Sequence, residues 1–235
     1  MAFTDFSCVY YDDGDKLGKL LAYAALIPYV LILFHASAFY CRRCAARPVA
    51  PPEPLTLTRL LDIRRDIHEA VIFAGLVLNE GVARALKHLL AHPRPPATCA
   101  KLDLCDEFGM PSSHTQCIAF AFAVHALLCA RGFALKSLST RLVEGFESIA
   151  LLVATAMVAT SRVYLGYHEL EQVAAGACLG MLLGAATYAT LSWKLWAGIA
   201  SSPLGRFFHL KSTLTSSELD RLELEARFYR KLKPE

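Results

Sequence analysis

Five long apolar stretches constrain the fold of this chain more than any other feature of its sequence. They lie near residues 20–40, 67–90, 115–130, 146–164 and 173–196. A helix needs about twenty mostly apolar residues to cross a bilayer, and each stretch reaches or approaches that length. Strand signals are lacking, and 55% of the residues are hydrophobic while only 19% are charged. The sequence therefore predicts an all-α, polytopic membrane helix bundle with about five transmembrane helices.

The chain is expected to divide into a membrane domain and a tail. We interpret the first apolar stretch as a retained span, because its apolar run is too long for the core of a signal peptide. Residues 1–200 then form the transmembrane domain, and residues 201–235 form a cytosolic amphipathic tail. In this tail, Thr215 and Glu218 fit a capping box at the start of a short helix. Its apolar stripe would pack against the bundle or the membrane surface, and it comprises Leu219, Leu222, Ala226 and Tyr229.

Basic loops predict how the spans are oriented. Segment 41–66 carries six arginines, segment 131–145 carries three basic residues, and the C-terminal tail is rich in lysine and arginine. Because short, positively charged loops stay in the cytosol, we expect all three there. With five spans, the N-terminus and segments 91–114 and 161–172 then lie on the opposite side. These two polar segments would face the same compartment.

The chain ends in RKLKPE, which resembles a dilysine retrieval signal. Lys231 and Lys233 stand at the fifth and third positions from the end. Such a signal is read only on a cytosolic C-terminus, which the predicted topology supplies. A basic tail near anionic lipid is the alternative. We therefore expect a multi-pass protein of the endoplasmic reticulum membrane with its C-terminus in the cytosol.

Polar residues cluster where segments 91–114 and 161–172 meet the spans. Taken singly, Arg162 could snorkel to the interface and His168 could be a solvated loop residue. Together, the cations would repel one another unless an anion lay between them, and arginine forks match the oxygens of phosphate. Two histidines could then serve as nucleophile and proton donor. The cluster comprises Lys87, Arg94, Arg162, Ser112, Ser113, His114 and His168.

The second apolar stretch also carries charges within the span. Glu80, Arg84 and Lys87 are spaced i, i+4 and i+7, which places them on one helical face. Ionisable groups inside a span are costly and usually face the protein interior. We therefore expect Glu80 and Arg84 to form a structural ion pair inside the bundle.

Several classes of function fit the sequence poorly. A net charge of +3, without a dense block of lysine and arginine, does not indicate nucleic-acid binding. Asp103, Asp106 and Glu107 form no recognisable set of metal ligands, so we expect neither a metal nor a cofactor. The CRRC motif at 41–44 lacks two further zinc ligands. We interpret its cysteines as free thiols, with palmitoylation as the alternative.

Three motifs carry a resemblance to a known family. KHLLAHPRP begins at Lys87, PSSH ends at His114, and SRVYLGYH ends at His168. In order and spacing they resemble the K-x6-R-P, P-S-G-H and S-R-x5-H-x3-D motifs of the type 2 phosphatidic acid phosphatase (PAP2) superfamily. The longer strings LNEGVARALKHLLAHPRP and FGMPSSHTQ are similar to its eukaryotic dolichyldiphosphatase branch, as is GKLLAYAALIPYVLI near the N-terminus.

The resemblance implies a role for each matching residue. His168 would attack phosphorus and form a phosphohistidine. His114 would protonate the departing oxygen and then activate water. The cations Lys87, Arg94 and Arg162 would hold the phosphoryl oxygens. The Ser112 hydroxyl and the Ser113 backbone N–H of the PSSH turn would help them.

Two positions depart from the family pattern. Ser113 replaces the usual glycine, and it keeps the N–H if the backbone angles suit a non-glycine residue. Gln172 replaces aspartate, so it could orient His168 through its amide oxygen but brings no charge. A glutamine at this position resembles the pattern of the dolichyldiphosphatase branch, which commonly carries glutamine there. Glu171 is the alternative orienting residue.

The predicted topology places the site in the lumen, and the resemblance implies an enzyme that hydrolyses dolichyl diphosphate to dolichyl phosphate and phosphate. This reaction would support dolichol recycling for protein N-glycosylation, with the isoprenoid tail remaining in the bilayer. The alternative is a related phosphatase acting on phosphatidate, a sphingoid phosphate or another polyprenyl diphosphate. A non-catalytic scaffold fits less well because the cations and histidines of the motifs are all present. A transporter fits less well because no repeated bundle is apparent.

Overall fold

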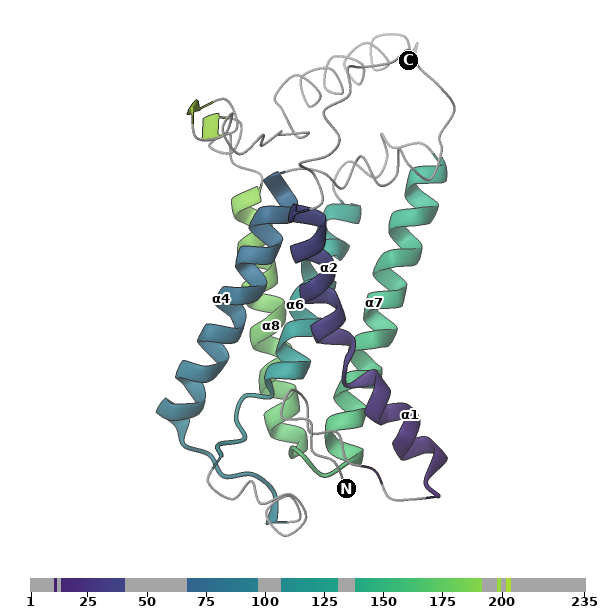
Figure 1. Ribbon diagram of the computed structural model, residues 1–235, viewed down its shortest axis with the longest axis vertical. Helices are drawn as coiled ribbons and strands as arrows, with labels where there is room; N and C mark the ends of the chain where they lie inside the picture. Colours follow the sequence, from purple (N-terminus) through teal and green to yellow (C-terminus); the bar gives the residue numbers. More distant parts are fainter. Residues whose placement is uncertain are drawn as a thin grey trace, which may run out of the picture.

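The computed structural model describes residues 11, 14–40, 67–96, 107–130, 138–191, 198, 199, 202 and 203. In these residues the chain forms helices and no strand, apart from one isolated bridge between Pro93 and Phe108. The prediction of an all-α membrane bundle is confirmed (Figure 1). The helices are α1 (Lys16–Ala24), α2 (Ile27–Tyr40), α4 (Ile67–Leu90), α6 (Ser113–Ala130), α7 (Leu138–Tyr164) and α8 (Leu170–Leu191).

As far as the described residues reach, each of the five predicted spans coincides with helix, although several boundaries differ. Among the described residues, four helical stretches are long and apolar enough to cross a membrane, and they are Lys16–Ser37, Ser113–Ala130, Arg141–Tyr164 and Leu170–Leu191. Helix α4 has 24 residues and is also long enough, but its charged residues make it more polar than the others. The helices α6, α7 and α8 all begin earlier than the apolar pattern predicted, because polar residues form their first turns.

The first span is broken into two helices, which the sequence analysis did not predict. Helix α1 is capped by Asp15, which precedes it and whose Oδ1 accepts a hydrogen bond from the Gly18 N–H at 2.9 Å. It ends at Ala24, and α2 starts shortly after it. Pro28 has no N–H to continue the hydrogen-bond ladder from α1, which accounts for the break.

Helix α6 lies at the centre of the bundle and packs closely on α8. Three glycines recur at every fourth residue on the face of α8 that meets α6. A Cβ added at Gly176 would lie 2.6 Å from the Ser112 carbonyl oxygen, and one at Gly184 would lie 2.6 Å from that of Phe120. Gly180 approaches the backbone of Gln116 more closely still. This spacing of small residues is visible in the sequence and indicates close packing of two membrane helices, which the sequence analysis did not predict.

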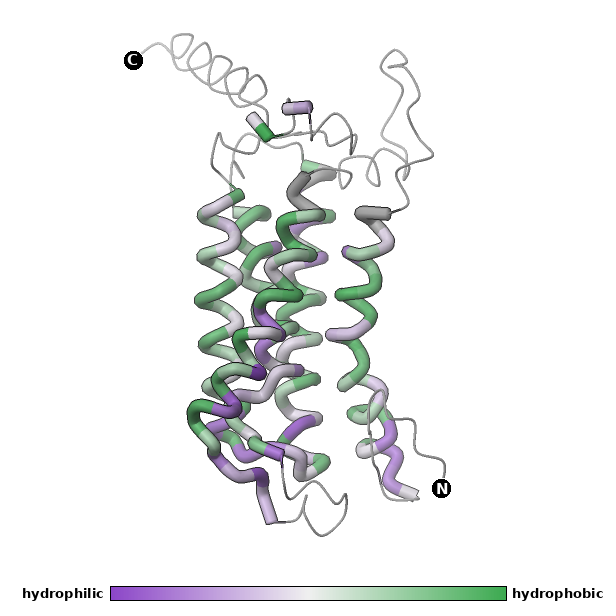
Figure 2. The backbone as a smooth tube through the Cα atoms, turned by 60° about the vertical axis from the view of Figure 1, so that its left-hand side comes forward, coloured by the Kyte–Doolittle hydropathy of each residue, from purple (hydrophilic) through white to green (hydrophobic). Residues whose placement is uncertain are grey.

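A polar contact joins α6 to α4 within the apolar core. The Gln116 side-chain amide donates to the Asn79 side-chain oxygen at 2.9 Å and to the Asn79 carbonyl at 3.0 Å. Both residues are buried, so these bonds fix the register of the two helices. Figure 2 shows that hydrophilic residues gather toward the end of the bundle where α1 and α6 begin.

Several predictions fall outside the described residues. They concern the basic loop 41–66 with its CRRC motif, Asp103 and Asp106, the helix from Thr215, and the dilysine signal. The division into residues 1–200 and 201–235 and the orientation in the membrane therefore stay predictions.

Candidate active site

Three chain segments meet at one end of the bundle. Helix α4 ends there, α6 begins there, and the turn between α7 and α8 lies beside them (Figure 1). These segments carry the residues of the three sequence motifs. The structure thus brings together the two polar segments that the sequence placed on one side of the membrane.

The turn after α7 places His168 close to Arg162. The Tyr167 N–H donates to the Arg162 carbonyl at 3.0 Å, and the Gly166 N–H donates to the Val163 carbonyl at 3.0 Å. With Gly166 at φ +75°, this is a Schellman motif, in which glycine avoids the strain of a left-handed residue. The Arg162 guanidinium carbon lies 3.9 Å from the centroid of the Tyr167 ring. The spacing of SRVYLGYH therefore reflects a defined helix end.

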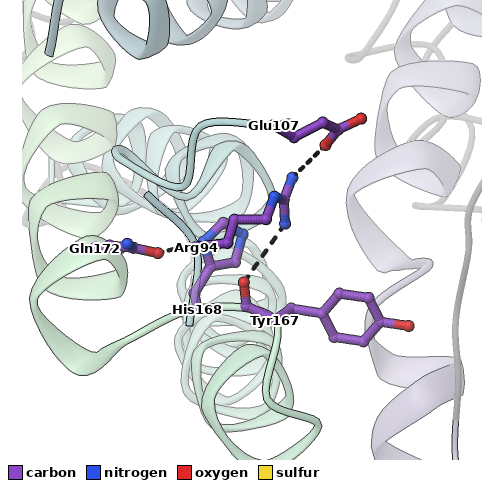
Figure 3. A network of polar contacts seen from close by, with 5 residues as sticks. All are labelled: Arg94, Glu107, Tyr167, His168 and Gln172. Carbon is purple, nitrogen blue, oxygen red and sulfur yellow. Dashed lines mark hydrogen bonds and ion pairs between the residues drawn. The ribbon is translucent and has the colours of Figure 1, made fainter. Parts of the chain in front are cut away.

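Gln172 holds the imidazole of His168. The His168 Nδ1 lies 3.0 Å from the Gln172 Oε1, and both side chains are buried (Figure 3). The amide orientation is set by the other end, because the Gln172 Nε2 donates to the Pro93 carbonyl at 2.8 Å and a carbonyl can only accept. Oxygen therefore faces His168, whose Nδ1 carries the proton and whose Nε2 carries the lone pair. Glu171 is exposed, so Gln172 rather than Glu171 orients His168.

His92 also contributes to this contact, and sequence reasoning did not single it out. Its Nδ1 lies 3.0 Å from the Gln172 Nε2, and its carbonyl accepts from the Gly109 N–H at 2.8 Å. A side chain at Gly109 would collide with Gln172. The Ser112 N–H in turn donates to the Gln172 carbonyl at 3.0 Å. Gln172 thus connects the segments after α4 and before α6.

Two buried arginines have N–H groups that no group in the described residues accepts. The Arg94 side chain is 7% exposed, and its Nη2 lies 2.6 Å from the Glu107 Oε2 while its Nη1 lies 3.4 Å from the Tyr167 carbonyl oxygen (Figure 3). Its Nε has no hydrogen-bond partner among the described residues, and neither has the Nε of buried Arg162. Buried donors left unpaired are costly, so an anion is the expected partner.

The remaining predicted residues surround the two arginines. Lys87 is half-buried in the last turn of α4 and lies within electrostatic range of Arg94 and Arg162. Half-buried His114 lies in the first turn of α6, and its ring meets that of Tyr29 from α2 edge-on, with centroids 5.2 Å apart.

The serines have different surroundings. Ser112 is fully buried and precedes α6, with its Oγ 3.2 Å from the Thr115 Oγ1. Half-buried Ser113 is the first residue of α6, so its N–H belongs to a helix N-terminus that favours anions. Ser161 of SRVYLGYH instead donates to the Leu21 carbonyl at 2.8 Å, so it joins α7 to α1.

The environment keeps His168 neutral. Burial, followed by the positive charges of Arg162 and Arg94, lowers the pKa of His168 well below its ordinary value of 6.5. The hydrogen bond to Gln172 opposes this shift only in part. A neutral imidazole with its lone pair on Nε2 can act as a nucleophile at neutral pH.

The predicted ion pair of α4 forms, but its expected position is wrong. The Arg84 Nε lies 3.1 Å from the Glu80 Oε1, with side chains that are 76% and 38% exposed respectively. Neither lies inside the bundle, because Leu76, Asn79 and Ala83 occupy the buried face of α4.

Among the described residues, no group of three or more histidine, cysteine or acidic side chains could hold a metal ion.

Comparison with known proteins places this arrangement in a family. The family model described as the PAP2 superfamily matches residues 69–196, which include α6, α7, α8 and nearly all of α4. The chain belongs to the PAP2 superfamily. It is therefore a multi-pass membrane phosphatase, and the matched region contains all three sequence motifs.

Curated PAP2 relatives resemble the chain over most of its length. Dolichyldiphosphatase 1 of Rhinolophus ferrumequinum is 32% identical over 217 residues, which cover 87% of this chain and 79% of the relative. Lipid phosphate phosphatase gamma of Arabidopsis thaliana is 29% identical and covers 95% of this chain and 90% of the relative. The dolichyldiphosphatase of Saccharomyces cerevisiae is 29% identical over 77% of this chain and 66% of its own. No solved structure matches the chain.

Proposed function

We propose that this PAP2 phosphatase hydrolyses dolichyl diphosphate to dolichyl phosphate and phosphate. The observation that carries the proposal is the pair of buried arginine Nε–H groups of Arg94 and Arg162, which have no partner in the described part of the chain and lie near a neutral His168. Such donors fit the oxygens of a phosphoryl group. Relatives named as dolichyldiphosphatases support the choice of substrate.

The first step is a transfer of the terminal phosphoryl group to His168. The His168 Nε2 forms a bond to phosphorus while the bond from phosphorus to the bridging oxygen breaks. The electron pair stays on that oxygen, which remains with the lipid phosphate and takes a proton from His114. Gln172 keeps the Nδ1 proton of His168 in place during the attack.

The second step regenerates the enzyme. His114 takes a proton from water, whose oxygen attacks the phosphohistidine and releases inorganic phosphate. In both steps, charge on the phosphoryl oxygens is stabilised by fixed cations and donors in a site with little water. These groups come from Lys87, Arg94, Arg162, Ser112 and Ser113.

The position of the site suits a lipid substrate. It lies at one end of the bundle, where a phosphate can enter from water while an isoprenoid tail remains in the bilayer. We place this end in the lumen of the endoplasmic reticulum, with the C-terminus in the cytosol. The reaction would then return dolichyl phosphate for protein N-glycosylation.

A second candidate function is hydrolysis of a lipid monophosphate such as phosphatidate or a sphingoid phosphate. The similarity to lipid phosphate phosphatase gamma of Arabidopsis thaliana, which covers 95% of this chain, favours it. The same phosphoryl pocket would serve, since the transferred group is identical.

Phosphate release by the purified protein in detergent distinguishes these functions. We expect kcat/KM to be highest for dolichyl diphosphate, lower for farnesyl diphosphate and lowest for phosphatidate, with undiminished rates in a strong chelator. The variant His168→Ala controls for contaminating phosphatases. A preference for phosphatidate would favour the second function, and a requirement for added magnesium would contradict the metal-free mechanism.

A further inference from the structure

Arg84 is a cation of α4 that the proposed phosphoryl site does not use. It lies three residues before Lys87 and near it on the helical surface, displaced by about 4.5 Å along the axis toward the middle of the span. Its side chain is 76% exposed, although α4 is otherwise largely apolar. A charged group at such a position is costly in a membrane and often marks a substrate path.

The groups around Arg84 connect it to the proposed site. Tyr29 of α2 lies within electrostatic range of Glu80, Arg84 and Arg162, and its ring touches His114. Helices α2 and α4 pack on each other. Arg84 and His114, the residue proposed to protonate the leaving group, therefore have Tyr29 as a common neighbour.

The guanidinium of Arg84 retains unused donors. Its Nε bonds to the Glu80 Oε1 at 3.1 Å, and its two terminal nitrogens make no hydrogen bond within the described part of the chain. Two adjacent N–H groups of arginine can bind a phosphate in bidentate fashion. Glu80 neutralises Arg84 while no anion is bound.

We propose that Arg84 binds the lipid-side phosphate of a lipid diphosphate and thereby selects diphosphates over monophosphates. This inference rests on the proposed function. When Lys87, Arg94 and Arg162 hold the terminal phosphate, the second phosphate lies between it and the tail. The tail extends into the bilayer, so the second phosphate is displaced from Lys87 in the direction of Arg84.

Arg84 would stabilise the charge that develops on the leaving group. When the bond from the terminal phosphorus to the bridging oxygen breaks, the electron pair adds charge to the departing lipid phosphate. A cation beside that phosphate stabilises the charge as it develops. A lipid monophosphate has no second phosphate at this place, so its leaving group offers Arg84 no phosphate oxygens to bind.

The test compares kcat/KM for dolichyl diphosphate and for phosphatidate in mixed micelles. The variant is the double substitution Glu80→Gln with Arg84→Gln, which removes the cation without leaving an unpaired carboxylate. We expect the ratio of the two kcat/KM values to fall about 10- to 100-fold, as for a lost hydrogen bond between charged groups. Lys19→Gln removes an exposed cation of α1 and should leave the ratio unchanged.

If the double variant does not fold, the single variant Arg84→Gln is measured in its place. We expect it to lower the same ratio of kcat/KM for dolichyl diphosphate to that for phosphatidate. An unchanged ratio in a folded variant of wild-type thermal stability would overturn the role of Arg84 while leaving the proposed function intact. Wild-type protein that hydrolyses phosphatidate but not dolichyl diphosphate would overturn both.

Discussion

Replacing Gln172 by glutamate tests how the structure prepares His168 for attack. Glutamate has the size of glutamine and would bring the negative charge that aspartate supplies in the wider family pattern. From general chemistry alone, the substitution would be expected to help. The structure predicts that the substitution lowers activity, because the Gln172 amide also donates a hydrogen bond to the Pro93 carbonyl.

Two effects set the magnitude. The carboxylate would lie about where the Gln172 Oε1 lies, 3.0 Å from the His168 Nδ1, and an opposite charge at that distance raises a pKa by about one to three units. Its other oxygen would face the Pro93 carbonyl at the present 2.8 Å, where no hydrogen bond can form. Losing that bond costs about 1 kcal/mol, equivalent to about fivefold in kcat/KM.

The sign of the pH dependence follows from the neutral state that attack requires. In the wild type, the pKa of His168 lies well below 6.5, so the acid limb of the kcat/KM profile, where this imidazole becomes protonated, lies at acidic pH. The carboxylate introduced by Gln172→Glu would raise this pKa, so the acid limb of the profile should move to higher pH by at least about one unit.

The assay is the pH profile of kcat/KM in detergent, with thermal unfolding measured in parallel. Glu171→Gln is the matched control, since Glu171 is the exposed neighbour and its substitution should leave the profile in place. An acid limb that stays in place in Gln172→Glu, together with an unchanged rate at neutral pH, would refute the assigned amide orientation.

Four further expectations concern separate parts of the protein. Phosphorus-labelled substrate, quenched in alkali, should leave label on the wild type but not on His168→Ala, and robust turnover by that variant would exclude the mechanism. Glu107→Gln should tighten vanadate binding about two- to fivefold by removing the exposed carboxylate that now occupies Arg94, whereas weaker binding would show that Glu107 positions the arginine. Gly180→Ala should destabilise the bundle by about 1–3 kcal/mol in thermal unfolding, because its Cβ meets the α6 backbone; Gly145→Ala has open space, and an equal loss there would contradict this account. In selectively permeabilised cells, a C-terminal tag should be accessible from the cytosol and an N-terminal tag should not, and a protected C-terminal tag would reject the orientation.

Local chemistry made much of the protein predictable from its sequence. Apolar runs of span length identify a membrane helix bundle because a bilayer leaves the backbone few alternatives. The cations and histidines of the three motifs point to phosphate because that combination of charges needs an anion. Gly166 in SRVYLGYH also carries a local signal, since a glycine just past a helix end is typical of the turn observed there.

The sequence pattern alone left several features open. The span near residues 20–40 divides between Ala24 and Ile27, just before Pro28, although its apolar character runs across the break. Arg84 and Glu80 pair as their spacing predicts, yet they lie outside the bundle. Which face of α4 is buried depends on the partner helix, because Gln116 of α6 bonds to Asn79 and draws that face inward.

The amino-acid sequence by itself determined the membrane-bundle class, the helical segments and the set of residues suited to phosphate chemistry. Only the tertiary structure decided how those residues relate to one another. It showed that Gln172 rather than Glu171 holds His168, and that the Pro93 carbonyl fixes the direction of the amide. Composition and helical periodicity act over a few residues, whereas the bond from Gln172 to Pro93 joins positions 79 residues apart. The glycines of α8 let it pack closely on α6, and the lack of a side chain at Gly109 leaves room for Gln172 between the segments that it joins.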